Sequence, residues 1–390
     1  GTQDTSLNCT VSRSDADGHA VTSTFRWKDG AGTTFDTAAT TGTSDTISIK
    51  YYYDNGTLVE GENVTCEVTP NDDFDTGVAM TDSTTLNTKP VISSVTLDST
   101  PIVGTQDTSL VCNIVRSDAD GHTVTSNFVW KDGAGATLET YSTTGASDAI
   151  NIKSYVDSGT LVQDENVTCE VTPSDNFDTG DAKSDTTQIN NIPVISTVTL
   201  DSTTYVSPDD TSLKCTIVRS DADSHTVNST FRWKDGSGVT FESGSTSGAD
   251  YYLNLKNYVD TGVLVEGETV TCEVTPSDGY DTGAAKSDST KINRVPVINS
   301  VTLDSATYVS TQDTDLNCTV SRTDGDGHSV TLTYRWKDGA GATIETNSTT
   351  STVDDINIKT YVDNGTLVEG ETVTCEVTPN DAYDTGTAMS

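Results

Sequence analysis

The sequence predicts an all-β protein made of repeated modules, and three observations carry this prediction. Cysteines and tryptophans recur along the 390-residue chain at one fixed step, as in Trp27, Trp130, Trp233 and Trp336. Apolar residues alternate with polar ones in short stretches, which is typical of strands with one buried face. Turns rich in Gly, Asn, Asp and Pro separate these stretches, and helical periodicity is absent.

Each expected strand shows this alternation. In residues 6–11, Leu7, Cys9 and Val11 fall on one face. Thr and Val are frequent in these stretches, as in strands with one face in water. The other expected strands of the repeat are residues 24–28, 46–50, 63–68 and 93–98.

The step of 103 residues divides the chain into four expected modules. Repetition at a fixed period is the signature of stacked units. The predicted boundaries are 1–88, 89–191, 192–294 and 295–390, and we call these ranges modules 1 to 4. Compared with the repeat, module 1 lacks its first strand and module 4 is truncated at its C-terminal end. We therefore expect a window from a longer array, in which a strand from another copy completes the open sheet edge of module 1.

The cysteines predict one disulfide per module. Two cysteines lie 57 residues apart in each module, and a bridge there would remove roughly 4 kcal/mol of unfolded-state freedom. Regular pairs in small modules favour disulfides and an oxidising compartment. Zinc is the alternative, but no module has the C-x2-C pair of a zinc site. The expected bridge cysteines are Cys9, Cys66, Cys112, Cys169, Cys215, Cys272, Cys318 and Cys375.

The charge excludes two classes of partner. With 59 acidic and 21 basic residues the net charge is −38, so nucleic acid and anionic membrane surfaces would be repelled. No apolar run long enough to span a membrane is visible, and we expect no direct membrane insertion in this chain. A solvated acidic surface, divalent cations or high salt remain as explanations.

The order of Cys9, Trp27 and Cys66 resembles the immunoglobulin-like sandwich, and the resemblance covers all four modules. It implies that strands B and F are bridged and that the tryptophan of strand C packs on the bridge. The corner tyrosine of true immunoglobulin domains is replaced by Val64 and its counterparts. The stretches "SDADGH-VT", "F-W-DG" and "VTCEVTPND" are similar to the Ig-like and PKD-like repeats of large prokaryotic cell-surface proteins. That resemblance implies a structural or adhesive role.

The heptad "RSDADGH" at residues 13–19 recurs in every module. In an immunoglobulin-like sandwich it forms the B–C loop, and residues 69–77 form the F–G loop at the same end. Short connectors stiffened by proline, such as residues 86–92, enter the next module at that end. We therefore expect the acidic loops to lie at the junction between neighbouring modules.

Two interpretations of these loops stay open. Oxygen-rich clusters bind Ca2+, which takes about six to eight oxygens and would stiffen the junction. Alternatively, Asp-Gly and Asx turns cap the loops through their own backbone, without an ion. The candidate Ca2+ ligands are Asp118, Asp120, Asp175, Asp178, Asp221, Asp223, Asp278, Asp281, Asp324, Asp326, Asp381, Asp384, Asn87, Asn190 and Asn293.

The remaining heptad residues receive structural roles. We expect the histidine that ends each heptad, such as His122, to pack or hydrogen bond beside the loop, with a metal or pH-sensing role as the alternative. The arginine that opens it, such as Arg116, is expected to pair with carboxylates. The tryptophans are expected in the core.

Eight N-x-[S/T] triplets are candidate glycosylation sites. Composition alone accounts for almost all of them, so glycosylation is plausible only through the extracellular prediction. The candidates are Asn8, Asn55, Asn63, Asn166, Asn228, Asn317, Asn347 and Asn364.

No catalytic or cofactor motif occurs in the sequence, so we expect no enzyme and no organic cofactor. The leading interpretation is an extracellular structural protein, a rod- or filament-forming array at the cell surface. Its expected partners are further copies of itself or neighbouring repeats in a longer array. The alternative is an adhesin or carbohydrate-binding module whose partners are surface glycans.

Overall fold

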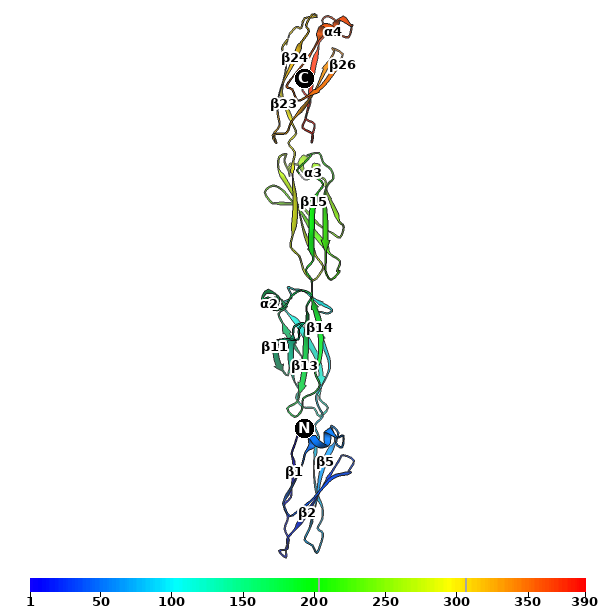
Figure 1. The fold of residues 1–390 in the computed structure, drawn as a ribbon, viewed down its shortest axis with the longest axis vertical. Coiled ribbons are helices and arrows are strands. Elements are labelled where there is room, and N and C mark those ends of the chain that lie inside the picture. The colour runs from blue at the N-terminus through cyan, green and yellow to red at the C-terminus, as the bar shows by residue number, and fades with distance from the viewer. Residues whose placement is uncertain (203, 306) are drawn as a thin grey trace. The chain divides into compact units, whose positions relative to one another are not determined.

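The computed structural model describes residues 1–202, 204–305 and 307–390 (Figure 1). The chain forms two compact units, residues 1–191 and residues 192–390. Each unit contains two of the 103-residue repeats, and both are built almost entirely from strands. Each helix in the described part of the chain falls short of the length and apolarity that a membrane crossing requires.

Module 2 contains the full set of strands. These are β7 (Val91–Leu97), β8 (Ile102–Val103), β9 (Leu110–Ser117), β10 (Thr125–Lys131), β11 (Thr137–Thr143), β12 (Ser147–Ile150), β13 (Asn166–Ser174) and β14 (Lys183–Ile189). One sheet has the order β12-β9-β7 and the other has the order β11-β10-β13-β14-β8. Neighbouring strands are antiparallel except β14 and β8, which are parallel. Two facing sheets in this order form an immunoglobulin-like sandwich.

Module 3 repeats this arrangement, whereas the second sheet of module 4 has three strands among the described residues. The strands of module 3 are β15 (Val194–Leu200), β16 (Tyr205–Val206), β17 (Leu213–Ser220), β18 (Asn228–Lys234), β19 (Thr240–Thr246), β20 (Asp250–Leu253), β21 (Thr269–Ser277) and β22 (Lys286–Ile292). Those of module 4 are β23 (Val297–Leu303), β24 (Leu316–Thr323), β25 (Thr331–Lys337), β26 (Thr343–Thr349), β27 (Val353–Ile356) and β28 (Thr374–Asn380). The order of that second sheet is β26-β25-β28.

Module 1 has a smaller first sheet. Its strands are β1 (Leu7–Thr10), β2 (Thr22–Lys28), β3 (Thr34–Thr40), β4 (Ser44–Ile47), β5 (Asn63–Asn71) and β6 (Met80–Thr85). β1 pairs only with β4, whereas β3-β2-β5-β6 form the second sheet. The five strands expected from the sequence are present, but β3, β6, β8 and their counterparts were not among the expected strands.

A disulfide and a tryptophan form the centre of each core. In module 2 Cys112 is bonded to Cys169, and Trp130 of β10 lies opposite Cys169 in the ladder with β13. All three side chains are fully buried, which agrees with the expected core tryptophan. The same pairing joins Cys9 to Cys66, Cys215 to Cys272, and Cys318 to Cys375. The one disulfide per module that the sequence predicts is therefore confirmed.

A short helix replaces the end of one expected strand. The stretch 46–50 was expected to be a strand throughout, but β4 ends at Ile47 and α1 (Ile49–Asp54) follows. The Ser48 hydroxyl accepts a hydrogen bond from the Tyr51 amide, which is an N-cap. The first helical residue, Ile49, is buried. The counterparts are α2 (Ile152–Asp157), α3 (Leu255–Asp260) and α4 (Ile358–Asp363), which start after asparagine caps.

Candidate functional site: the acidic loops at the module junctions

The candidate site of each unit lies where one module is connected to the next. In unit 1 the connector follows β6 of module 1. Two loops of module 2 meet it, residues 118–124 between β9 and β10 and residues 175–182 between β13 and β14. The heptad and the F–G loop therefore face the connector, as the sequence predicts.

Asn87 of the connector is the centre of the junction in unit 1. Its side-chain amide donates hydrogen bonds to the Oδ2 atoms of Asp175 and Asp178, and the donor–acceptor distance is 2.9 Å in both. Asp178 also accepts the backbone amide of Thr2 at 3.0 Å and the Thr2 hydroxyl at 2.7 Å. These four side chains are buried. The F–G loop of module 2 is thus bonded to both ends of module 1.

The heptad loop makes a second contact with the same connector. Asp120 accepts the backbone amide of Thr88 at 2.6 Å. Asp118 does not reach the connector, because its Oδ1 accepts the amides of Asp120 and His122 at 3.0 and 2.9 Å. Asp118 therefore forms an Asx turn that shapes the loop, and Asp120 binds the neighbouring module.

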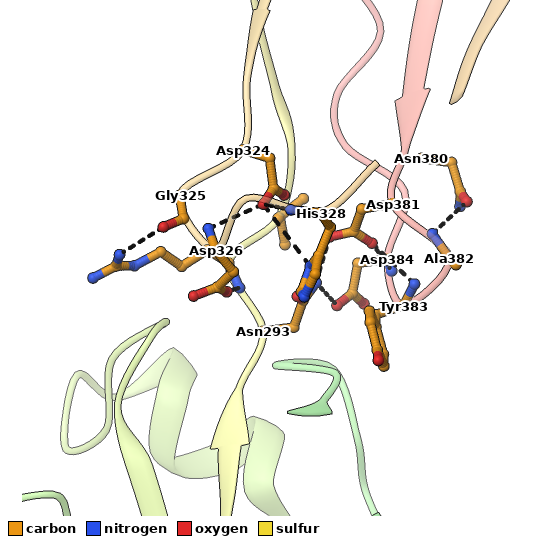
Figure 2. Close-up of polar contacts among 12 residues, drawn as sticks. Asn293, Asp324, Gly325, Asp326, His328, Asn380, Asp381, Ala382, Tyr383 and Asp384 are labelled. Carbon is orange, nitrogen blue, oxygen red and sulfur yellow. Dashed lines mark hydrogen bonds and ion pairs between the residues drawn. The ribbon is translucent and has the colours of Figure 1, made fainter. Parts of the chain in front are cut away.

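Unit 2 has the same arrangement in its own junction. Figure 2 shows Asn293 reaching from the connector after β22 to the F–G loop of module 4. Its side-chain amide donates to Asp381 Oδ2 and Asp384 Oδ2, and the donor–acceptor distance is 2.8 Å in both. The Ser207 hydroxyl donates to Asp384, as Thr2 does to Asp178. Recurrence in two units indicates a built junction and not a chance contact.

The heptad contact in unit 2 also involves charge. Asp326 accepts the backbone amide of Arg294 at 2.8 Å and forms an ion pair with the ammonium group of Lys291. Burial alone would raise the pKa of Asp326, but Lys291 and the Arg294 amide outweigh burial and lower the pKa below its ordinary value. The carboxylate is therefore held ionised at the junction.

The F–G carboxylates are held ionised in the same way. Burial alone would raise the pKa of Asp178, but hydrogen bonds from Thr2 and Asn87 lower the pKa below its ordinary value. The pKa of Asp175 is also lowered despite burial, by the Asp178 amide first and then by the Asn87 side chain and the Phe177 amide. Hydrogen bonds to an ionised carboxylate stabilise its charged form.

Each heptad histidine packs on the aromatic residue of the F–G loop. The His122 and Phe177 rings have centroids 4.9 Å apart, and those of His328 and Tyr383 have the same separation. In unit 2 Tyr205 also contacts the His328 ring, with centroids 4.4 Å apart. The histidine therefore links the two loops of its own module.

Several of the predicted Ca2+ ligands already take part in hydrogen bonds within the protein. Asp120 and Asp178 accept hydrogen bonds from the neighbouring module, and the side-chain nitrogen of Asn87 donates to Asp175 and Asp178. In module 3 Asp278 accepts the Tyr280 and Asp281 amides at 2.8 Å. Asp221, Asp223 and His225 form one group there, while the backbone amide of Asn190 donates to Val103 at 2.9 Å. Calcium binding stays a prediction.

The expected pairing of the heptad arginines with carboxylates is wrong. Arg116 donates to the Ser126 hydroxyl at 2.6 Å and to the carbonyl oxygens of Thr143 and Thr144. The guanidinium group instead donates to backbone carbonyl oxygens at the end of β11 and in the loop that follows it, because backbone carbonyl oxygens need a hydrogen-bond donor. Its role is to fix the loop.

Sequence reasoning missed one glycine that the junction requires. A Cβ atom added at Gly180 would lie 1.9 Å from the carbonyl oxygen of Pro90 in the connector. Gly283 and Gly386 lie equally close to Pro193 and Pro296. The sequence signal for this glycine was the repeated "DTG" that follows the aromatic residue of each F–G loop. Glycine permits the close approach of two backbone segments because it has no Cβ atom.

Seven of the eight candidate glycosylation asparagines are exposed, and Asn317 is partly buried. An N-linked glycan is attached to the side-chain nitrogen of asparagine. At two of the candidate asparagines this nitrogen already donates a hydrogen bond. Asn317 Nδ2 donates to Asp304 at 2.9 Å, and Asn347 Nδ2 donates to Asp354 at 2.6 Å. Glycosylation at these two positions would require the loss of a hydrogen bond.

Solved structures of known proteins include matches to this chain. The crystal structure of chicken CNTN1 FN1-FN3 domains matches this chain with 11% identity and a TM-score of 0.29. The match covers 74% of this chain and 94% of that chain. No family model matches the sequence, and no curated protein matches it. The immunoglobulin-like assignment therefore depends on the strand order and disulfides of the chain itself.

Proposed function

We propose that this chain is an extracellular structural protein whose modules form a rod- or filament-like array at the cell surface. The observation that carries the proposal is the junction network that both units share. A buried asparagine amide from the connector bridges two carboxylates of the next module in each case. Hydrogen bonds to charged groups are worth about 1.5–3 kcal/mol each, which is enough to restrict motion at a junction.

Two further features support an extracellular position. Disulfides such as Cys112–Cys169 form and persist in oxidising environments. The net charge of −38 keeps an exposed array soluble, because like charges on neighbouring chains repel one another and oppose non-specific aggregation. Copies of the chain or neighbouring repeats are the proposed partners.

Small-angle X-ray scattering on the 390-residue chain tests the proposal. Four sandwiches of roughly 35–40 Å each predict a maximum dimension of about 150 Å with a stiff-chain profile. In the double variant Asn87→Ala/Asn293→Ala we expect a shorter mean extension and the profile of a flexible chain. A wild-type chain that scatters as flexibly as the variant would contradict the structural role. Specific glycan binding on an array would instead favour the adhesin alternative.

A further inference from the structure

Modules 2, 3 and 4 each bury one carboxylate oxygen and one imidazole nitrogen without a hydrogen-bond partner among the described residues. These atoms are Asp118 Oδ2 and His122 Nδ1, Asp221 Oδ2 and His225 Nδ1, and Asp324 Oδ2 and His328 Nδ1. The aspartate side chains are only 2%, 1% and 4% exposed. Buried polar groups are nearly always satisfied, so an unsatisfied pair at the same place in three modules calls for a ligand.

The geometry of the three side chains suits a shared metal ion, because one ligand atom from each of Asp118, His122 and Asp175 lies within 4.8 Å of the others. His122 Nδ1 lies 3.8 Å from Asp118 Oδ1 and 3.6 Å from Asp175 Oδ2. In module 4 the same atoms of His328, Asp324 and Asp381 give 3.9 and 3.6 Å. These distances exceed a hydrogen bond. Two ligands on one ion with bonds near 2.0–2.2 Å lie about 3.3–3.6 Å apart at a tetrahedral angle, so small shifts would close the site.

The surrounding contacts orient the three side chains. Asp118 uses Oδ1 for two backbone amides of its own loop, which leaves Oδ2 free. Asp175 likewise uses Oδ1 for the Phe177 and Asp178 amides. Its Oδ2 accepts one hydrogen bond from the Asn87 side chain at 2.9 Å and lies 3.6 Å from His122 Nδ1. The imidazole is fixed by its contact with the Phe177 ring. Such outer contacts hold metal ligands in place before the ion arrives.

The donor set indicates the class of ion. Ca2+ needs about six to eight oxygens, but Asp120 and Asp178 are already bound by Thr88 and Thr2. One imidazole nitrogen and two carboxylates suit Zn2+ or a similar first-row divalent ion, with solvent in the open positions. We propose that the groups Asp118–His122–Asp175 and Asp324–His328–Asp381 each bind one such ion.

Module 1 provides an internal contrast. Asp15, His19 and Asp72 form the same group, with distances of 3.8 and 3.6 Å from the imidazole nitrogen. Its histidine side chain is 45% exposed, compared with 16% for His328. Water competes more strongly for exposed ligands, so the module 1 group binds the ion more weakly than the module 4 group.

The test uses the full chain, without a polyhistidine tag, dialysed against a chelator and titrated with ZnCl2 by calorimetry. The double variant His122→Gln/His328→Gln loses two equivalents of bound Zn2+, and each single variant loses one. Asp157→Asn is the control, because it removes an exposed carboxylate of module 2 that lies outside both loops. It retains the wild-type stoichiometry.

A second readout separates loss of the site from misfolding. Co2+ in place of Zn2+ gives visible d–d absorption in the wild type, and the double variant loses that absorption while melting cooperatively. The proposal is overturned if the wild type binds no Zn2+, if the double variant keeps the wild-type stoichiometry, or if Ca2+ occupies the loops and excludes Zn2+. The titration measures bound metal and not the extension of the chain, so the structural proposal is tested separately by the scattering of the Asn87→Ala/Asn293→Ala variant.

Discussion

The Asn293 side chain donates a hydrogen bond of 2.8 Å to Asp384, and the two residues lie in successive modules. The same amide also bonds Asp381 at 2.8 Å (Figure 2). One buried asparagine therefore connects the end of one sandwich to the F–G loop of the next. Removal of its amide would take from both carboxylates the donor that joins them to the preceding module.

The first prediction concerns opening of this junction. Asn293→Ala removes hydrogen bonds to charged groups, worth about 1.5–3 kcal/mol each. We expect limited trypsin digestion to cleave after Arg294 at least roughly 10- to 150-fold faster, which is the factor for the loss of one of the two bonds, because cleavage of an opened segment follows its population. Cleavage sites and rates are read by mass spectrometry. Asn87→Ala is the control, since Lys89 precedes Pro90 and resists trypsin. Equal rates in Asn293→Ala and wild type would contradict this role.

A second prediction concerns the glycine at the F–G loop. In Gly180→Ala the new methyl group would lie 1.9 Å from the Pro90 carbonyl oxygen, so the loop or connector must shift. We expect a loss of about 1–3 kcal/mol, as for other overpacked sites, measured by thermal unfolding. Gly77→Ala is the matched control because its nearest contact is only the Pro70 side chain at 2.9 Å. If both variants melt alike, the close approach to the connector is unimportant.

The sequence predicted the sandwich because its signals are local and repeated. Alternation places Leu7 and Cys9 on one face of a strand, and the Cys–Trp–Cys order identifies the bridged strands. The six-residue helix α1 was missed because only Ile49 is buried in it, which leaves no helical period to detect. Strand β3 was missed because it lies at a sheet edge and none of its side chains is buried, so it shows no clear alternation of buried and exposed residues.

The candidate site was predicted less completely. The repeat placed the acidic loops beside the connector. Asn87 was singled out among connector residues as a Ca2+ ligand, and the structure shows its side-chain nitrogen donating to Asp175 and Asp178. However, which carboxylates bind the neighbouring module depends on contacts between distant segments. Thr2 and Asp178 are 176 positions apart, and no local pattern links them. The free ligand pair of Asp118 and His122 likewise became visible only once Asp120 was found to be bound to Thr88.

A third prediction concerns the core tryptophan. Trp130 is fully buried, and its Nε1 donates to Asp148 Oδ2 at 2.8 Å. Asp148→Ala leaves this N–H group buried and unpaired, which costs about 1–3 kcal/mol. We expect the calorimetric transition of module 2 to fall by roughly 4–8 °C per kcal/mol. Asp250→Ala is the control, because Asp250 accepts only the Thr216 hydroxyl at the surface, and it should change stability by less than about 0.5 kcal/mol.

The last prediction concerns alkaline stability and depends on Tyr334, which stands where the other modules have Phe25, Phe128 and Phe231. Burial first, and then the charge of Asp354, raise the pKa of Tyr334 from 10.0 to about 12. The unfolded chain then loses this proton at lower pH than the folded chain. The contribution of Tyr334 to stability is therefore complete below about pH 10 and is lost as the pH rises from about 10 to 12.

Tyr334→Phe removes that dependence, so we expect module 4 of the variant to keep more of its neutral-pH stability above pH 10 than the wild type. At neutral pH the variant loses the hydrogen bond from the Tyr334 hydroxyl to the Ser351 carbonyl oxygen, worth about 0.5–1.5 kcal/mol. Thermal unfolding from pH 8 to 12, with tyrosinate absorbance recorded in parallel, measures both effects. Tyr308→Phe is the control, because Tyr308 is 90% exposed. A Tyr334→Phe variant that loses stability with pH as steeply as the Tyr308→Phe control would show that Tyr334 titrates without coupling to folding.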